Sequence, residues 1–186
     1  MSIELFGDQR KIGGRPLHMF LITDESGSMG GEKIQTLNTA IRESVPAIKD
    51  VALENPTARI YLRAITFSSG ANLHIPPTPV EDFQWQDIDH PGGVTDMGKA
   101  LNMVADALKI PPMEERALPP VLILISDGHP TDDFNAGLKA LLNQPWGKKS
   151  IRIAIEIGKD ADESTLQKFI GHPELKVLRA NKAEEL

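Results

Sequence analysis

The sequence predicts a doubly wound α/β domain: a mostly parallel sheet with one antiparallel edge strand and helices on both faces. Short, almost uninterrupted apolar runs alternate with segments in which apolar residues recur every three or four positions. This is the pattern of buried parallel strands joined by amphipathic helices. Polar, glycine-containing segments follow several of the apolar runs, as expected where right-handed crossovers turn back over a sheet.

The first predicted strand is the apolar run from Leu17 to Ile22, which ends at Asp24. A long amphipathic helix is expected after Gly31. Pro46 falls inside this helix and is expected to kink it or to end its regular part early, because proline lacks an N–H donor. The apolar residues spaced along its buried face are Ile34, Leu37, Ile41, Val45, Ile48 and Ala52.

The next two strands are predicted to form a hairpin at one edge of the sheet. Residues 60–67 are rich in β-formers and end at a Ser-Ser-Gly turn. Residues 73–75 form a weaker strand that runs into Pro76 and Pro77. Since proline cannot donate to a strand ladder, this piece belongs at an edge, antiparallel to its predecessor. Phe83 and Trp85 are expected to pin the following loop, 81–93.

The rest of the chain continues the alternation of helix and strand. In chain order we expect a helix at 96–108, a strand at 121–125, a helix at 133–142, a strand at 151–157, a helix at 162–170, a short strand at 177–178, and the start of a helix at 182–186. Asp132 and Asp133 are expected to cap the helix at 133–142 rather than to bind metal.

We interpret the chain as one domain, because 186 residues are enough to bury a self-sufficient core. Residues 1–16 are assigned to an N-terminal extension. Residues 17–186 are assigned to the domain itself, with a last helix that the chain leaves unfinished.

Composition argues against several classes of partner. The net charge of −6 disfavours nucleic-acid binding, which needs a clustered basic face. Lys148 and Lys149, beside Arg152, come nearest to such a cluster and are interpreted as a solvated turn. No signal sequence or membrane-spanning run is recognised, and cysteine is absent. We therefore expect a cytoplasmic protein that binds neither nucleic acid nor membrane.

Three polar segments are expected at the carboxyl edge of the sheet, where α/β folds bind ligands. They are residues 24–28, 92–96 and 127–133. The segments offer hard oxygen donors and no cysteine, which favours Mg²⁺, with Mn²⁺ or Ca²⁺ as alternatives. Alternate residues of an extended segment point the same way, so Asp24, Ser26 and Ser28 can aim three oxygens at one point. Gly27 is expected to allow that tight loop.

Three motifs carry a family resemblance: Asp-Glu-Ser-Gly-Ser-Met at 24–29, Gly-Val-Thr at 93–95 and Ser-Asp-Gly at 126–128. Together and in this order they resemble the metal-ion-dependent adhesion site of von Willebrand factor type A (VWA) domains, which have a Rossmann-like fold. The resemblance extends from about Leu17 to Leu178. The Asp-Gly-His-Pro-Thr-Asp form at 127–132 is similar to bacterial TerY-like proteins of this family.

The resemblance implies a metal site made of Asp24, Ser26, Ser28, Thr95 and Asp127. It implies that the two serine hydroxyls bind the ion directly and that Thr95 binds it directly or through water. Asp24 and Asp127 would act mainly through water, and an Asp or Glu of a partner protein would complete the octahedron.

The function that follows is a non-catalytic, metal-dependent protein-interaction module that binds an acidic side chain of another protein. The TerY-like resemblance implies a bacterial stress, tellurium-resistance or phospho-signalling setting, with a kinase, phosphatase or ATPase as partner.

Two alternatives stay open. An aspartate after the first strand also suits a metal-assisted phosphohydrolase. Ser26 stands where an aspartyl-phosphate enzyme has a second acid, however, and no nucleophile–base pair is recognisable. Phosphorylation of Ser or Thr residues near the site by a kinase would place negative charge beside the ligands.

Overall fold

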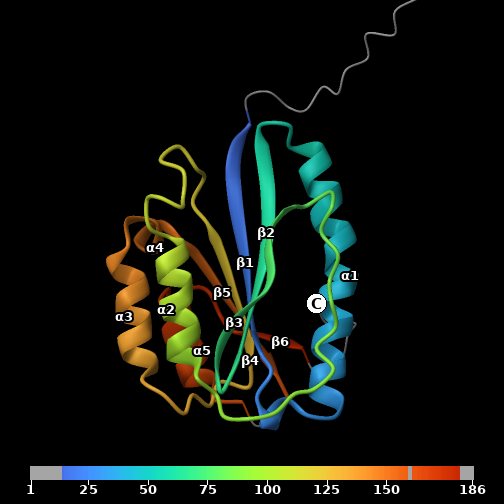
Figure 1. Cartoon of the computed structure of the whole chain (residues 1–186), viewed down its shortest axis with the longest axis vertical. Helices are drawn as coiled ribbons and strands as arrows, with labels where there is room; N and C mark the ends of the chain where they lie inside the picture. Colours follow the sequence, from blue (N-terminus) through green and yellow to red (C-terminus); the bar gives the residue numbers. More distant parts are fainter. Residues whose placement is uncertain (1–13, 159–160, 181–186) are drawn as a thin grey trace, which may run out of the picture.

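The computed structural model describes residues 14–158 and 161–180, in which six strands form one sheet in the order β3-β2-β1-β4-β5-β6 (Figure 1). All neighbouring strands are parallel except β2 and β3, which pair antiparallel at one edge. The strands are β1 (Arg15–Asp24), β2 (Ala58–Ser68), β3 (Gly70–Pro79), β4 (Val121–Ser126), β5 (Ile151–Ile157) and β6 (Leu178–Ala180). The predicted fold class, with its antiparallel edge strand, is confirmed.

Helices cover both faces of the sheet. One face carries α1 (Glu32–Glu54), which Figure 1 shows alone on its side of the sheet. The other face carries α2 (Met97–Ala107), α3 (Phe134–Asn143) and α5 (Glu163–Ile170), with the short α4 (Pro145–Lys149) following α3. A one-turn 3₁₀ helix, η1 (Gly27–Met29), connects β1 to α1.

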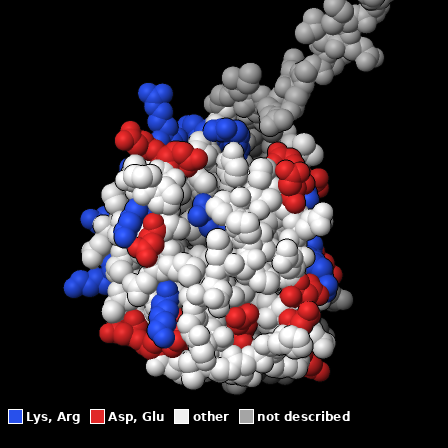
Figure 2. All heavy atoms as spheres, viewed as in Figure 1, with Lys and Arg blue, Asp and Glu red and all other residues white. Residues whose placement is uncertain are grey.

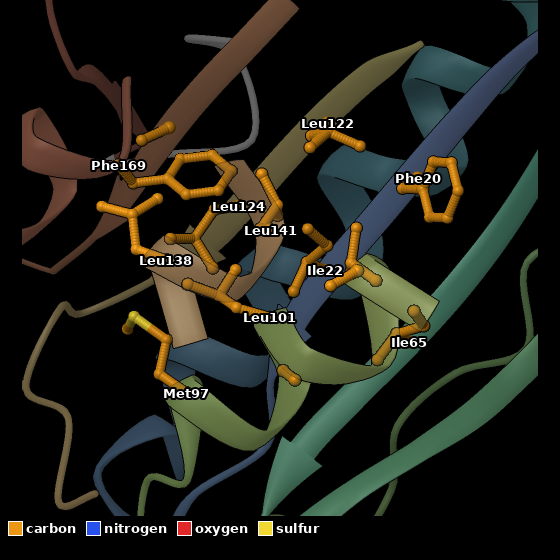
Figure 3. Close-up of a cluster of buried hydrophobic side chains, with 14 of the residues drawn as sticks. Phe20, Ile22, Ile65, Met97, Leu101, Leu122, Leu124, Leu138, Leu141 and Phe169 are labelled. Atoms are coloured by element: carbon orange, nitrogen blue, oxygen red, sulfur yellow. The ribbon is translucent and has the colours of Figure 1, made fainter. Parts of the chain in front are cut away.

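Each face of the sheet has its own apolar core. On the side of α2, Phe20 and Leu124 from the sheet pack with Leu101, Leu138 and Phe169 from the three helices (Figure 3). The cluster on the α1 side joins the apolar stripe of α1 to Leu21, Leu62 and Ile155, among others. Because both faces are buried, the central strands read as continuous apolar runs rather than as alternating ones.

Helix α1 continues through Pro46 to Glu54. Of the two outcomes predicted for Pro46, the early end is therefore wrong, and the kink stays a prediction. Pro46 is exposed, and the carbonyl that loses its hydrogen bond, that of Arg42, lies on the solvent side, where water can satisfy it. Val45 and Ala52 are buried on the sheet, and this packing holds the helix together on both sides of the proline.

The solvated turn predicted around Lys148 and Lys149 is instead the end of α4. Pro145 occupies the first turn of this helix, where a missing N–H costs nothing. Trp146 is buried, and the Lys149 ammonium lies 5.1 Å from the centre of its ring. Both lysines remain exposed, as predicted.

Strand β3 is longer than the three residues expected, because it pairs with β2 through a register irregularity that accommodates its prolines. The observed β1 begins at Arg15, two residues before the predicted strand. The helix predicted at 182–186 and most of the predicted extension, 1–13, lie outside the described residues.

A polar cluster lies near the amino ends of β1 and β2, and we call it the amino-end cluster: the buried His18 and Arg63 with the exposed Glu114. The Arg63 guanidinium donates to His18 Nδ1 at 3.0 Å, and His18 Nε2 lies 2.8 Å from Glu114 Oε2. Arginine has only donors, so His18 Nδ1 accepts and its Nε2 carries the proton. Burial lowers the pKa of His18, against an opposing effect of Glu114.

No helix in the described part of the chain is long and apolar enough to span a membrane.

Candidate metal centre

Three loops at the carboxyl edge of the sheet are joined by hydrogen bonds. The backbone N–H of Gly27 donates to Gly93 O at 3.1 Å, and that of Gly92 donates to Glu25 O at 2.8 Å. These two bonds connect the loop after β1 to the loop before α2. The Ser126 hydroxyl, at the end of β4, donates to Asp24 Oδ2 at 2.5 Å. The three segments predicted to meet at this edge therefore do so.

Asp24 is fully buried at the end of β1, and both of its carboxylate oxygens accept hydrogen bonds. Oδ2 accepts from the Ser126 hydroxyl, and Oδ1 accepts from the backbone N–H of Ser26 at 2.9 Å. Burial raises the pKa of Asp24, as does the neighbouring charge of Asp127, whereas the bonds from Ser126 and Ser26 lower it. The carboxylate is thus held in one orientation beneath the loop.

The hydroxyls of Ser26 and Ser28 lie 3.0 Å apart. Ser26 is buried and Ser28 is exposed, so the pair runs from the interior to the surface. The turn of η1 brings them together. Gly27 is not needed for that turn: its φ is not positive, and an added Cβ would make an ordinary 3.4 Å contact with Gly93 O. The expectation that Gly27 provides the tightness is therefore wrong.

Thr95 is buried directly before α2. Two hydrogen bonds fasten its backbone to Thr131: Thr95 N–H donates to the Thr131 hydroxyl at 2.9 Å, and Thr131 N–H donates to Thr95 O at 2.9 Å. These bonds link the loop before α2 to the loop before α3. A shift of one loop would therefore move the other.

Asp127 is almost completely buried after β4, with its side chain 1% exposed. Its Oδ1 atom has no hydrogen-bond partner in the described structure, whereas its Oδ2 lies 3.3 Å from the Lys33 ammonium. The next residue, Gly128, has a φ of +79°, and a Cβ there would lie 2.6 Å from Asp162 O. A side chain at 128 would therefore force apart the two segments that enclose Asp127.

The two aspartates before α3 have different structural roles. Asp133 caps α3, as predicted, by accepting from the backbone N–H of Ala136 at 2.9 Å. Asp132, predicted to cap the same helix, instead caps α2: its two oxygens accept from the N–H groups of Gly98 and Lys99, each at 2.8 Å. The prediction for Asp132 is wrong because the fold places the start of α2 beside this loop.

The donors at this edge are chemically suited to a hard cation. No group of three His, Cys, Asp or Glu side chains able to hold a metal occurs in the described residues, so a site here depends on hydroxyls in addition to two carboxylates. Two adjoining hydroxyls and a buried, unpartnered carboxylate oxygen are an oxygen-only donor set of the kind that Mg²⁺, Mn²⁺ and Ca²⁺ prefer. The residues present fit such an ion.

Lys33 was missed by the sequence reasoning. It lies in the first turn of α1, where a cation opposes the helix dipole. A lysine at that position, a few residues after a motif rich in oxygen donors, could have indicated from sequence that its ammonium contacts an acidic group of the site.

Comparison with known protein families gives a match over residues 18–186 to the von Willebrand factor type A domain. A comparison with curated protein sequences found no match.

Solved structures give many matches to the fold. The ArnB paralog VWA2 from Sulfolobus acidocaldarius is 19% identical with a TM-score of 0.65, covering 92% of this chain and 43% of that one. Manganese-loaded TRAP protein of Plasmodium vivax is 22% identical with a TM-score of 0.62, covering 91% and 70%. Proximal thread matrix protein 1 from the mussel byssus, with a zinc-occupied MIDAS motif, is 17% identical with a TM-score of 0.69, covering 93% and 46%. The chain spans less than half the length of the first of these structures.

Proposed function

The chain belongs to the von Willebrand factor type A domain family, and on that premise we propose that it is a metal-dependent protein-interaction module. Domains of this family are typically non-catalytic adhesion or interaction modules. In the proposed function, Asp24, Ser26, Ser28, Thr95 and Asp127 hold one divalent cation at the carboxyl edge of the sheet. An Asp or Glu side chain of a partner protein takes the remaining position.

One observation carries this proposal: the buried Asp127 Oδ1 lacks a partner in the described structure, while two hydroxyls lie 3.0 Å apart at the same edge. A buried carboxylate oxygen without a donor is costly, and a cation would compensate it. Ser26 and Ser28 would hold the ion through their hydroxyls, and Asp24, already fixed by two hydrogen bonds, would act mainly through water.

Mg²⁺ is the ion we propose, with Mn²⁺ or Ca²⁺ as alternatives, because every donor in the set is oxygen. Two relatives support a divalent ion in this fold: one is described as manganese-loaded and the other as having a zinc-occupied MIDAS motif. When bound, the ion supplies positive charge that attracts a carboxylate. The protein's own residues fix where that charge lies.

For the cellular setting we propose a cytoplasmic bacterial protein of the TerY-like group that acts in stress or tellurium resistance, with a kinase, phosphatase or ATPase as partner. The Asp-Gly-His-Pro-Thr-Asp form at 127–132 supports this assignment. On the face shown in Figure 2, basic side chains are interspersed with acidic ones, which suits a protein partner better than a polyanion.

A metal-assisted phosphohydrolase is the less favoured function. Such an enzyme of the aspartyl-phosphate type would attack phosphate with the aspartate after the first strand. Asp24 is fully buried here and both of its oxygens accept hydrogen bonds. A nucleophile needs a free, accessible oxygen.

Metal binding is tested by titrating Mg²⁺ and Mn²⁺ into the native protein, Asp24→Ala and Ser28→Ala while following thermal unfolding. Ser164→Ala is the matched control, because it removes an exposed serine hydroxyl that bonds only within the α5 cap among the contacts described. We expect the native protein and the control to gain about 2.7 kcal/mol at a metal concentration of 100 times Kd, and both site variants to gain far less.

Partner capture is tested with the native protein as bait, with and without chelator, and with Asp24→Ala as a second bait. We expect the native protein to capture a partner in the presence of metal, and we expect that capture to be lost in chelator and with the Asp24→Ala bait. Replacing the Asp or Glu of the partner that binds the metal should also abolish capture. Equal thermal stability and equal capture with and without metal would sink the proposed function.

A further inference from the structure

Lys33, in the first turn of α1, contacts the candidate metal centre through Asp127. Its ammonium lies 3.3 Å from Asp127 Oδ2, with side-chain exposures of 21% for Lys33 and 1% for Asp127. The pair joins the first turn of α1 to the end of β4. A positive charge in a first helical turn is unfavourable to the helix. The contact with Asp127 compensates for that position.

The charges at this edge are unequal without a metal. Asp24 and Asp127 bring two buried carboxylates to this edge, and Lys33, whose ammonium lies 3.3 Å from Asp127 Oδ2, brings one positive charge. A buried carboxylate needs a nearby cation to offset its lost hydration. Lys33 therefore already supplies part of the positive charge that a divalent ion would bring to Asp127.

We propose that Lys33 and the divalent cation compete electrostatically for Asp127, so that Lys33 lowers the metal affinity of the site while stabilising its metal-free form. This inference rests on the proposed function. A divalent ion beside Asp127 would be repelled by an ammonium in contact with the same carboxylate. Lys33 is a positioning residue in this scheme and not a metal ligand.

The net charge of the metal-bound site should also favour an anion. With the ion and Lys33 present, three positive charges face the two carboxylates of Asp24 and Asp127, which leaves one positive charge in excess. The carboxylate of a partner would remove that excess. Metal and partner should therefore increase each other's affinity by the same factor.

The test measures the Kd of Mn²⁺ by isothermal titration calorimetry on the native protein, Lys33→Met and Lys33→Arg. We expect Lys33→Met to bind Mn²⁺ roughly tenfold more tightly, and Lys33→Arg, which keeps the charge, to stay within about threefold of the native protein. Lys99→Met is the matched control: Lys99 pairs with Asp96 at 2.6 Å, beside Thr95, and its loss should change Kd by no more than about twofold.

A second measurement follows thermal unfolding in chelator, without metal. Lys33→Met should melt below the native protein there, because Asp127 loses its counterion, and added Mn²⁺ should narrow the difference. If Lys33→Met does not fold in chelator, Lys33→Gln takes its place, since it keeps an N–H donor without the charge.

The outcomes separate the two proposals. Equal or weaker Mn²⁺ binding by Lys33→Met, with normal binding by the native protein, overturns the role of Lys33 alone. If neither protein binds Mn²⁺, the proposed function fails and this inference fails with it. If Lys33→Met binds Mn²⁺ and the native protein does not, the opposition of Lys33 to the metal is supported and the proposed function of the native protein fails.

Discussion

Two polar clusters lie near opposite ends of β1, and they balance their charges differently. In the amino-end cluster, Arg63 donates to His18 and His18 donates to Glu114. One cation, one neutral ring and one anion sum to zero. At the carboxyl end, Asp24 and Asp127 bring two negative charges, and Lys33, which contacts Asp127, brings one positive charge. One negative charge is left in excess.

The two clusters also differ in which buried polar atom lacks a hydrogen-bond partner. In the described structure the amino-end cluster leaves a donor unpartnered, Arg63 Nε, whereas the carboxyl end leaves an acceptor, Asp127 Oδ1. The Arg63 guanidinium also lies 4.4 Å above the Phe20 ring, which partly offsets its burial. The first cluster is neutral and its charges are compensated within the fold. The second has spare negative charge and a free acceptor, which are the properties of a cation site.

Removing Arg63 is the strongest test of this difference between the two clusters. We expect Arg63→Ala to lower the free energy of unfolding by about 3 kcal/mol, because it leaves His18 and Glu114 without their cation and opens a cavity beside Phe20. Urea unfolding with and without Mn²⁺ measures this cost. It should be the same in both conditions, and a cost that appears only with metal would contradict the division between the clusters.

Removing Asp127 should have the opposite dependence on metal. Asp127→Asn removes the excess negative charge, so in chelator we expect a change in unfolding free energy below about 1 kcal/mol. With Mn²⁺ at 100 times Kd, the variant should lack the roughly 2.7 kcal/mol gained by the native protein. Paired urea unfolding curves check both numbers. A large cost in chelator would mean that Asp127 is mainly structural.

Asp132 tests whether every carboxylate at the carboxyl edge belongs to the metal centre. Since Asp132 caps α2, Asp132→Ala should cost about 1 kcal/mol, equally with and without metal. Its Mn²⁺ affinity, measured by calorimetry, should stay native. A loss of affinity would place Asp132 in the metal centre.

The smallest expected effect is a pH dependence of the amino-end cluster. The pKa of His18 is lowered in the folded protein, so the unfolded chain takes up a proton first as pH falls below about 6.5. Stability should therefore decrease on acidification from pH 7.5 to 5.5, by less than about 1.4 kcal/mol per pH unit. Thermal unfolding in chelator, compared with His18→Gln, isolates this contribution. An equal slope in both proteins would show that His18 does not titrate in this range.

The order and type of most elements could be read from the sequence, because apolar periodicity depends on neighbours within a few residues. The strand at 151–157 and the edge hairpin were predicted in this way. The five-residue metal site was also named from sequence, and the loops that carry it do meet at one edge. That these residues hold a metal remains a prediction.

The sequence by itself determined the features that depend on neighbouring residues. These are the alternation of strand and helix, and three oxygen-rich motifs that follow or lie between the strands. Tertiary structure decided what depends on partners distant in the chain. Helix α1 survives Pro46 because the sheet packs against it, and Asp132 caps α2 because two loops lie side by side. Lys33 and Asp127 are 94 residues apart, so only the fold could bring that ammonium to that carboxylate.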